Sequence, residues 1–151
     1  MADIVSPITT SQLDEHLAYG FLRIILGLNI CFHGVSRLLG DHAAFLAYLN
    51  QSMARAVLIP KASLPVMAAV LPWLEGSIGL LLLLGLFTRF ALLAGSAVMV
   101  TLVAGATLSQ NWDVAGLQLI YCLIYFVLLT YRDRNFLSLD TLLSRSRDRA
   151  A

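Results

Sequence analysis

Residues 64–87 read LPVMAAVLPWLEGSIGLLLLLGLF, and Glu75 carries the only charge in this stretch. About 20 apolar residues are enough for a helix to cross the hydrocarbon core of a bilayer. Three further segments meet the same length test, at approximately residues 17–38, 89–109 and 114–131. The sequence therefore predicts an all-α fold, a four-transmembrane-helix bundle. We expect it to occupy residues 1–151 as a single integral membrane domain.

The composition supports membrane insertion. The 151 residues are 59% hydrophobic and 13% charged, whereas soluble proteins carry roughly 25% charged residues. The net charge of +1 gives no indication of a nucleic-acid partner. Residues 1–16, MADIVSPITTSQLDEH, lack the basic start and apolar core of a secretory signal. Two cysteines without CxxC or Cys/His spacing give no support for a metal site.

The connections between the spans predict their arrangement. Residues 85–89 and 110–113 form short turns, so consecutive spans are expected to be antiparallel neighbours. The longer connection over residues 40–63 places Phe45, Leu49 and Met53 at helical spacing. The segment after residue 131 mixes leucines with arginines. We expect short interfacial helices in the first loop and at the C-terminus.

The distribution of basic residues predicts the orientation. Four spans place both termini on one side, which holds six arginines, whereas the other side holds three basic residues. Because loops rich in Lys and Arg stay in the cytoplasm, we expect both termini there. The lipid bilayer is then the first partner of the chain.

Arg23 and Glu75 are the most conspicuous residues, because each is a charge inside an apolar run. Such residues are costly in a membrane and mark functional sites by default. We place the outer membrane boundary at the end of the first span and the start of the second. At about 1.5 Å per residue, Glu75 then lies roughly 16 Å and Arg23 roughly 21 Å below this boundary. The sequence therefore predicts an Arg23–Glu75 pair. It is either a functional site or an ion pair that only fixes helix register.

The remaining candidates form polar or small-residue stripes. Glycines flank Arg23 at helical spacing and predict a packing face on the first span; they are Gly20, Gly27 and Gly34, with Cys31 between the last two. On the fourth span Gln118, Tyr121, Cys122 and Tyr125 form a similar stripe.

Other single residues allow alternative interpretations. His33 is either a proton relay or quinone ligand, or an ordinary interfacial histidine. Trp73 is a candidate lining residue of a pocket. Cys31 and Cys122 either pair or act as small hydrophobic residues.

Three short motifs then suggest a family. Arg23 and Gly27 are followed by HGVSRL at residues 33–38; LEG at residues 74–76 is followed by GLFTRF at residues 85–90; and NFLSLD closes the series at residues 135–140. In their order and spacing they resemble the DoxX family of small membrane proteins. Arg37 stands where lysine is common in that family, and the cysteines are not part of the pattern.

The resemblance implies a four-helix bundle in the bacterial cytoplasmic (inner) membrane. It also implies a link to thiosulfate:quinone oxidoreductase, so quinone is the cofactor that we expect. The first hypothesis is a subunit of a quinone-linked oxidoreductase. Arg23, Glu75 and His33 would be its catalytic candidates, and Tyr121, Gln118 and Trp73 would line its quinone pocket.

The second hypothesis is a non-catalytic accessory or assembly subunit, which packs against other membrane subunits or itself. A small transporter or channel is the third hypothesis. It has less support, because the sequence shows no inverted repeat.

Overall fold

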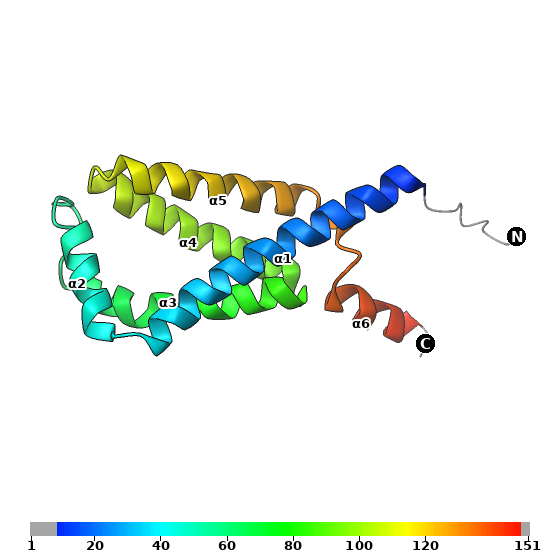
Figure 1. Ribbon diagram of the computed structural model, residues 1–151, viewed down its shortest axis with the longest axis horizontal. Helices are drawn as coiled ribbons and strands as arrows, with labels where there is room; N and C mark the ends of the chain where they lie inside the picture. Colours follow the sequence, from blue (N-terminus) through cyan, green and yellow to red (C-terminus); the bar gives the residue numbers. More distant parts are fainter. Residues whose placement is uncertain (1–8, 149–151) are drawn as a thin grey trace, which may run out of the picture.

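The computed structural model describes residues 9–148, which are mostly helical and contain no strand (Figure 1). In chain order the elements are α1 (Thr10–Leu39), α2 (His42–Ser52), α3 (Ser63–Leu84), α4 (Thr88–Leu108), α5 (Trp112–Thr130), a 3-10 helix η1 (Arg132–Arg134) and α6 (Leu139–Asp148). α1, α3, α4 and α5 are each long and apolar enough to cross a membrane. The predicted four-helix bundle, with short helices in the first loop and at the C-terminus, is confirmed.

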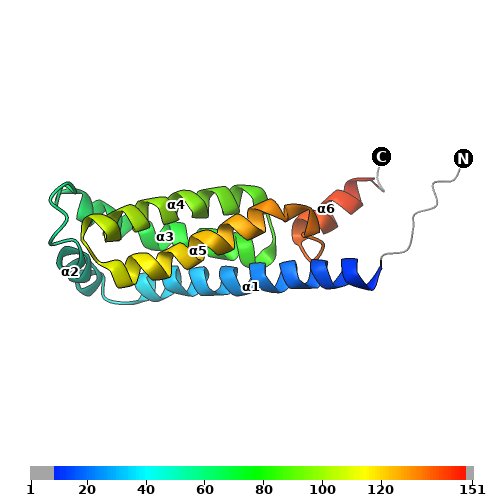
Figure 2. The same ribbon diagram turned by 90° about the horizontal axis from the view of Figure 1, so that it is seen from above.

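The first helix begins earlier than its predicted boundary at residue 17. Thr9 caps it, since its hydroxyl accepts from the Gln12 backbone N–H while the Gln12 side chain accepts from the Thr9 N–H. At about 1.5 Å per residue α1 is about 45 Å long, against about 30 Å of hydrocarbon. Its N-terminal part therefore extends beyond α3, α4 and α5, at the end of the bundle where α6 also lies (Figure 2).

α1 and α3 pack against each other through glycines at very close range. A Cβ added to Gly34 would lie 2.2 Å from the backbone nitrogen of Gly76, and one added to Gly79 would lie 2.1 Å from that of Cys31. Gly27 approaches Leu83 in the same way. The prediction that the glycine stripe of the first span is a packing face is confirmed.

These contacts fix the antiparallel register of α1 and α3. Facing residues have numbers that sum to about 110, as Gly34 with Gly76 and Cys31 with Gly79 show. Leu39, the last residue of α1, is therefore level with about residue 71 of α3. α3 begins at Ser63, about 12 Å further out along the axis.

α2 occupies the space left beyond the end of α1. It starts at the Asp41 cap, whose carboxylate accepts from the Ala43 N–H at 2.8 Å. Its Leu49 is buried. At its C-terminal end Met53 reaches α4, where the Ser109 hydroxyl lies 3.2 Å from the Met53 sulfur. α2 thus covers the end of the bundle opposite to the chain termini (Figure 1).

Candidate functional site

An ion pair joins α1 and α3 inside the bundle. The Arg37 guanidinium, in the last turn of α1, donates to a carboxylate oxygen of Glu75. Glu75 is only 5% exposed. The guanidinium also lies over the Phe45 ring of α2, 4.8 Å from its centroid, a favourable geometry for a cation near an aromatic face. Three helices therefore meet at this pair.

A small cavity surrounds the pair and has a volume of about 80 Å³. One water needs roughly 10–15 Å³ of such volume, so the cavity has room for several waters or a polar group. Its polar lining residues besides the pair are Tyr48, Ser52, Asn111 and Gln118. The Gln118 side-chain oxygen is buried and has no hydrogen-bond partner within residues 9–148. Buried polar atoms are rarely left unpaired, so this oxygen favours a ligand or water in the cavity.

A larger apolar groove adjoins this cavity between α3 and α4. Its volume is about 600 Å³, and among its lining residues are Ile59, Val66 and Val98. Four side chains line both spaces: Met53, Met67, Leu71 and Leu102. Methionine side chains are flexible. A charged cavity next to an apolar groove suits a ligand with a polar head and a hydrocarbon chain.

The predicted Arg23–Glu75 pair is wrong. In the observed register the residue of α1 level with Glu75 is about residue 35, and Arg23 is twelve residues away, about 18 Å along the axis. That is too far for an arginine side chain. The prediction assumed that the end of the first span and the start of the second lie at the same depth, whereas α3 starts about 12 Å beyond the end of α1. Glu75 has a basic partner in a neighbouring helix, but that partner is Arg37.

Arg23 instead stabilises the end of the bundle where the chain termini lie. It is 1% exposed, and its guanidinium donates to the carbonyl oxygens of Leu82, Leu83 and Leu137. The last carbonyls of a helix have no partner within the helix and carry negative partial charge. Arg23 therefore caps the C-terminus of α3 and ties it to the segment before α6.

The second and third sequence motifs meet at the same place. Gly85 ends α3 with φ +65°, a conformation that glycine adopts without strain. Asp140 accepts from the backbone N–H groups of Phe87 and Thr88, both at 2.8 Å, and so caps α4. Asn135 donates to the Thr88 hydroxyl at 3.0 Å. The GLFTRF and NFLSLD motifs thus have a structural explanation in capping and docking.

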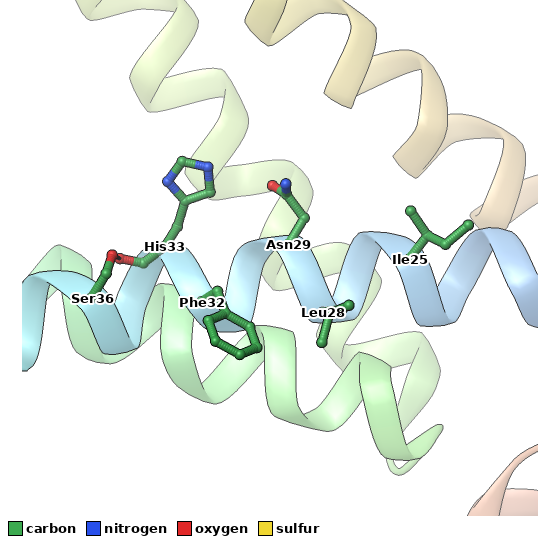
Figure 3. A pocket seen from close by; sticks show the side chains of 6 residues that line it. All are labelled: Ile25, Leu28, Asn29, Phe32, His33 and Ser36. Carbon is green, nitrogen blue, oxygen red and sulfur yellow. Dashed lines mark hydrogen bonds between the residues drawn. The ribbon is translucent and has the colours of Figure 1, made fainter.

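Three other predicted site residues lie outside the cavity. Trp73 is 65% exposed and faces away from the bundle. Tyr121 donates to the Asn29 side chain at 2.9 Å on the surface between α1 and α5. His33 is exposed on the face of α1 that carries Asn29, and the two side chains project in the same direction (Figure 3). Of the predicted site residues, the structure brings together Glu75 and Gln118 alone; any catalytic role of the others stays a prediction.

The cysteines are free thiols in the structure. Cys31 packs against Gly79, and Cys122 lies beside the hydrophobic core. Within residues 9–148 no three His, Cys, Asp or Glu side chains gather in a way that would hold a metal ion.

Arg37 is the site residue that the sequence interpretation missed. The sequence-based orientation counts it only as one of the three basic residues on the side away from the termini. Side chains on a helix tilt toward the helix N-terminus, so an arginine in the last turn of α1 reaches back into the bundle. Its place in the HGVSRL motif, one turn after Gly34, was the available signal.

The fold and the Arg37–Glu75 pair define a small multi-pass helical membrane protein with a polar cavity between its helices. The family model of DoxX matches residues 19–110, about three fifths of the chain. The protein therefore belongs to the DoxX family. Searches among curated proteins and among solved structures found no match.

Proposed function

We propose that this DoxX-family protein is a subunit of a quinone-linked membrane oxidoreductase, and that a quinone head group binds at the Arg37–Glu75 cavity. The observation that carries the proposal is the junction of this charged cavity with the apolar groove between α3 and α4. Membrane quinones have a polar ring and a long hydrocarbon tail, and these two spaces match the two parts.

The residues of the cavity fit the chemistry of such a ring. Bound quinone supplies a ring that takes up electrons together with protons. Arg37 has five N–H donors, so it can bind Glu75 and also donate to a ring oxygen. Glu75 is positioned to hold a proton at its carboxylate and pass it on. The unpaired Gln118 oxygen can accept from a ring hydroxyl.

Electrons must come from another component of the complex. We infer a partner membrane subunit that carries the redox group. Arg37 would then stabilise negative charge on the ring and Glu75 would transfer protons, and neither residue would carry electrons. Glu75 is buried while Arg37 is partly exposed, and a buried carboxylate is costly where an apolar residue could replace it, which favours a functional reason for retaining it.

The proposed location is the bacterial cytoplasmic membrane, with both termini inside. The structure adds one argument from charge. Arg23 lies at the terminal end of the bundle, beside Leu137, and so joins the basic residues of that side. This increases the excess of Lys and Arg that holds one side of a membrane protein in the cytoplasm.

Binding of decylubiquinone to the purified protein in lipid nanodiscs tests the proposal. Glu75→Gln and Arg37→Gln should each weaken binding about tenfold or more, because a charged hydrogen-bond partner contributes roughly 1.5–3 kcal/mol. Glu15→Gln is the matched control, because the Glu15–Arg134 pair is outside the cavity, and it should bind as the wild type does. Equal binding by all four proteins would refute the quinone site.

A groove variant tests the position of the tail separately. Thr101 lines the groove but not the cavity, so Thr101→Phe should fill the groove and leave the ion pair in place. We expect this variant to lose the preference of the wild type for decylubiquinone over a tail-less quinone.

An accessory subunit is the second candidate. It is favoured by α5, on which Ala115, Tyr125 and Leu128 are the buried residues, so that most of the helix is free to contact other subunits. Co-purification with a larger complex, with full quinone reduction by the Glu75→Gln complex, would favour this candidate.

A further inference from the structure

A stripe of polar side chains lies on the exposed face of α1. Asn29, His33 and Ser36 are four and three residues apart, so they share one side of the helix. They lie in a shallow hollow of about 490 Å³, which is otherwise lined by Ile25, Leu28 and Phe32 (Figure 3). The opposite face of α1 packs on α3. The stripe is therefore separate from the Arg37–Glu75 cavity.

These groups lie at membrane depth with incomplete hydrogen bonding. In the observed register Ser36 is level with about residue 74 of α3, near the middle of that span, and Asn29 is level with about residue 81, so the stripe lies alongside the second half of α3. Its side-chain oxygen accepts from Tyr121, but within residues 9–148 its amide nitrogen has no recorded partner, nor has the His33 ring. The Ser36 hydroxyl donates to the His33 carbonyl at 3.1 Å, which leaves its oxygen as an acceptor.

Lipid tails offer no hydrogen bonds, so exposed polar groups in a span favour contact with another helix. We propose that the Asn29–His33–Ser36 stripe is the interface with a second copy of this chain. In a two-fold dimer the same surface meets itself and must be self-complementary.

The chemistry of the stripe meets this requirement. Asn29 and neutral His33 each offer both a donor and an acceptor, and Ser36 adds an acceptor. No residue that lines the hollow is an acidic or basic side chain of the Asp, Glu, Lys or Arg type. Two copies therefore meet without repulsion between like charges.

The membrane adds a geometric constraint. Two copies inserted with the same orientation have parallel α1 helices, so each residue of the stripe lies opposite its own counterpart. Bulky Phe32 and Leu28 flank the stripe and pack beside it.

Cysteine cross-linking in native membranes tests the proposal. The background is the full chain with Cys31→Ala and Cys122→Ala, to which His33→Cys is added. The control is Val100→Cys, at an exposed position of α4. Oxidation should give a disulfide-linked dimer from His33→Cys and none from Val100→Cys.

A second measurement avoids dependence on cysteine chemistry. His33→Leu combined with Ser36→Ala should leave the α1–α3 contact and the melting temperature unchanged, while it weakens dimerisation in detergent about tenfold, because the interhelical hydrogen bonds are lost. No dimer from His33→Cys, equal dimer from both cysteine variants, or a cross-link to a different protein would overturn the proposal. So would unchanged dimerisation of the double variant.

Discussion

The sharpest prediction from the packing concerns two glycines that face each other across α1 and α3. Gly34→Ala is expected to destabilise the protein, whereas Gly76→Ala is not. A Cβ at position 34 would lie 2.2 Å from the Gly76 nitrogen, 2.5 Å from the Pro72 carbonyl oxygen and 2.6 Å from the Gly76 Cα. A Cβ at position 76 would meet only the Gly34 Cα, at 4.0 Å.

The magnitude follows from these distances. Ordinary van der Waals contact begins at 3.4 Å, so Gly34→Ala must move the two backbones apart by about 1.2 Å. Such overpacking typically costs about 1–3 kcal/mol, toward the upper end where the opposing atoms are backbone. The higher helix propensity of alanine offsets about 0.5–1 kcal/mol of this loss in unfolding free energy. We expect a net loss of about 2 kcal/mol for Gly34→Ala and a gain of up to about 1 kcal/mol for Gly76→Ala.

Reversible unfolding in mixed micelles, followed by circular dichroism, measures both changes. Gly116→Ala is the control for helix propensity, because a Cβ there meets nothing within 4 Å. It should behave as Gly76→Ala does. If Gly34→Ala were as stable as these two variants, α1 and α3 would not approach as closely as described, and the register that joins Arg37 to Glu75 would lose its support.

The remaining predictions concern the terminal end of the bundle and the exposed surface. Arg23→Met should lower the unfolding free energy by about 3 kcal/mol, because three buried carbonyl contacts are lost; Arg23→Lys should recover part of the loss, and a neutral Arg23→Met would contradict the capping role. Asp140→Ala should cost about 1 kcal/mol in the same assay through loss of the α4 cap, and an unchanged midpoint would show that the cap is unimportant. Trp73→Leu should alter neither stability nor decylubiquinone binding, since the indole faces outward, and weaker binding would place Trp73 in the site after all.

The fold was predictable because the length of each apolar run is enough to identify it as a membrane span. Glu75 within residues 64–87 did not interrupt the run, and the short turns fixed the antiparallel order. The start of α1 was missed, because Asp14, Glu15 and His16 look like a solvated segment. In the structure Glu15 pairs with Arg134 and His16 lies 2.9 Å from the Arg134 carbonyl oxygen, contacts that no local pattern contains.

The site was only partly predictable for a related reason. Hydropathy locates a span along the chain to within a few residues, but it does not give the offset between two helices. That offset comes from the close contacts of Gly27, Gly34 and Gly79. The observed register of α1 against α3 differs by about eight residues from the predicted one, and this shift makes Arg37 the partner of Glu75 in place of Arg23.

The most direct test of this account is the partner of the Glu75 carboxylate in the membrane. Glu15 and Glu75 are the only glutamates in the chain, so a Glu15→Gln protein labelled with ¹³C at the glutamate carboxyl carbon and ¹⁵N at arginine reports on Glu75 alone. Dipolar recoupling by solid-state NMR in lipid bilayers should show a close carboxylate–guanidinium contact that persists in Arg23→Lys and disappears in Arg37→Lys. A contact that persists in Arg37→Lys and disappears in Arg23→Lys would contradict the account.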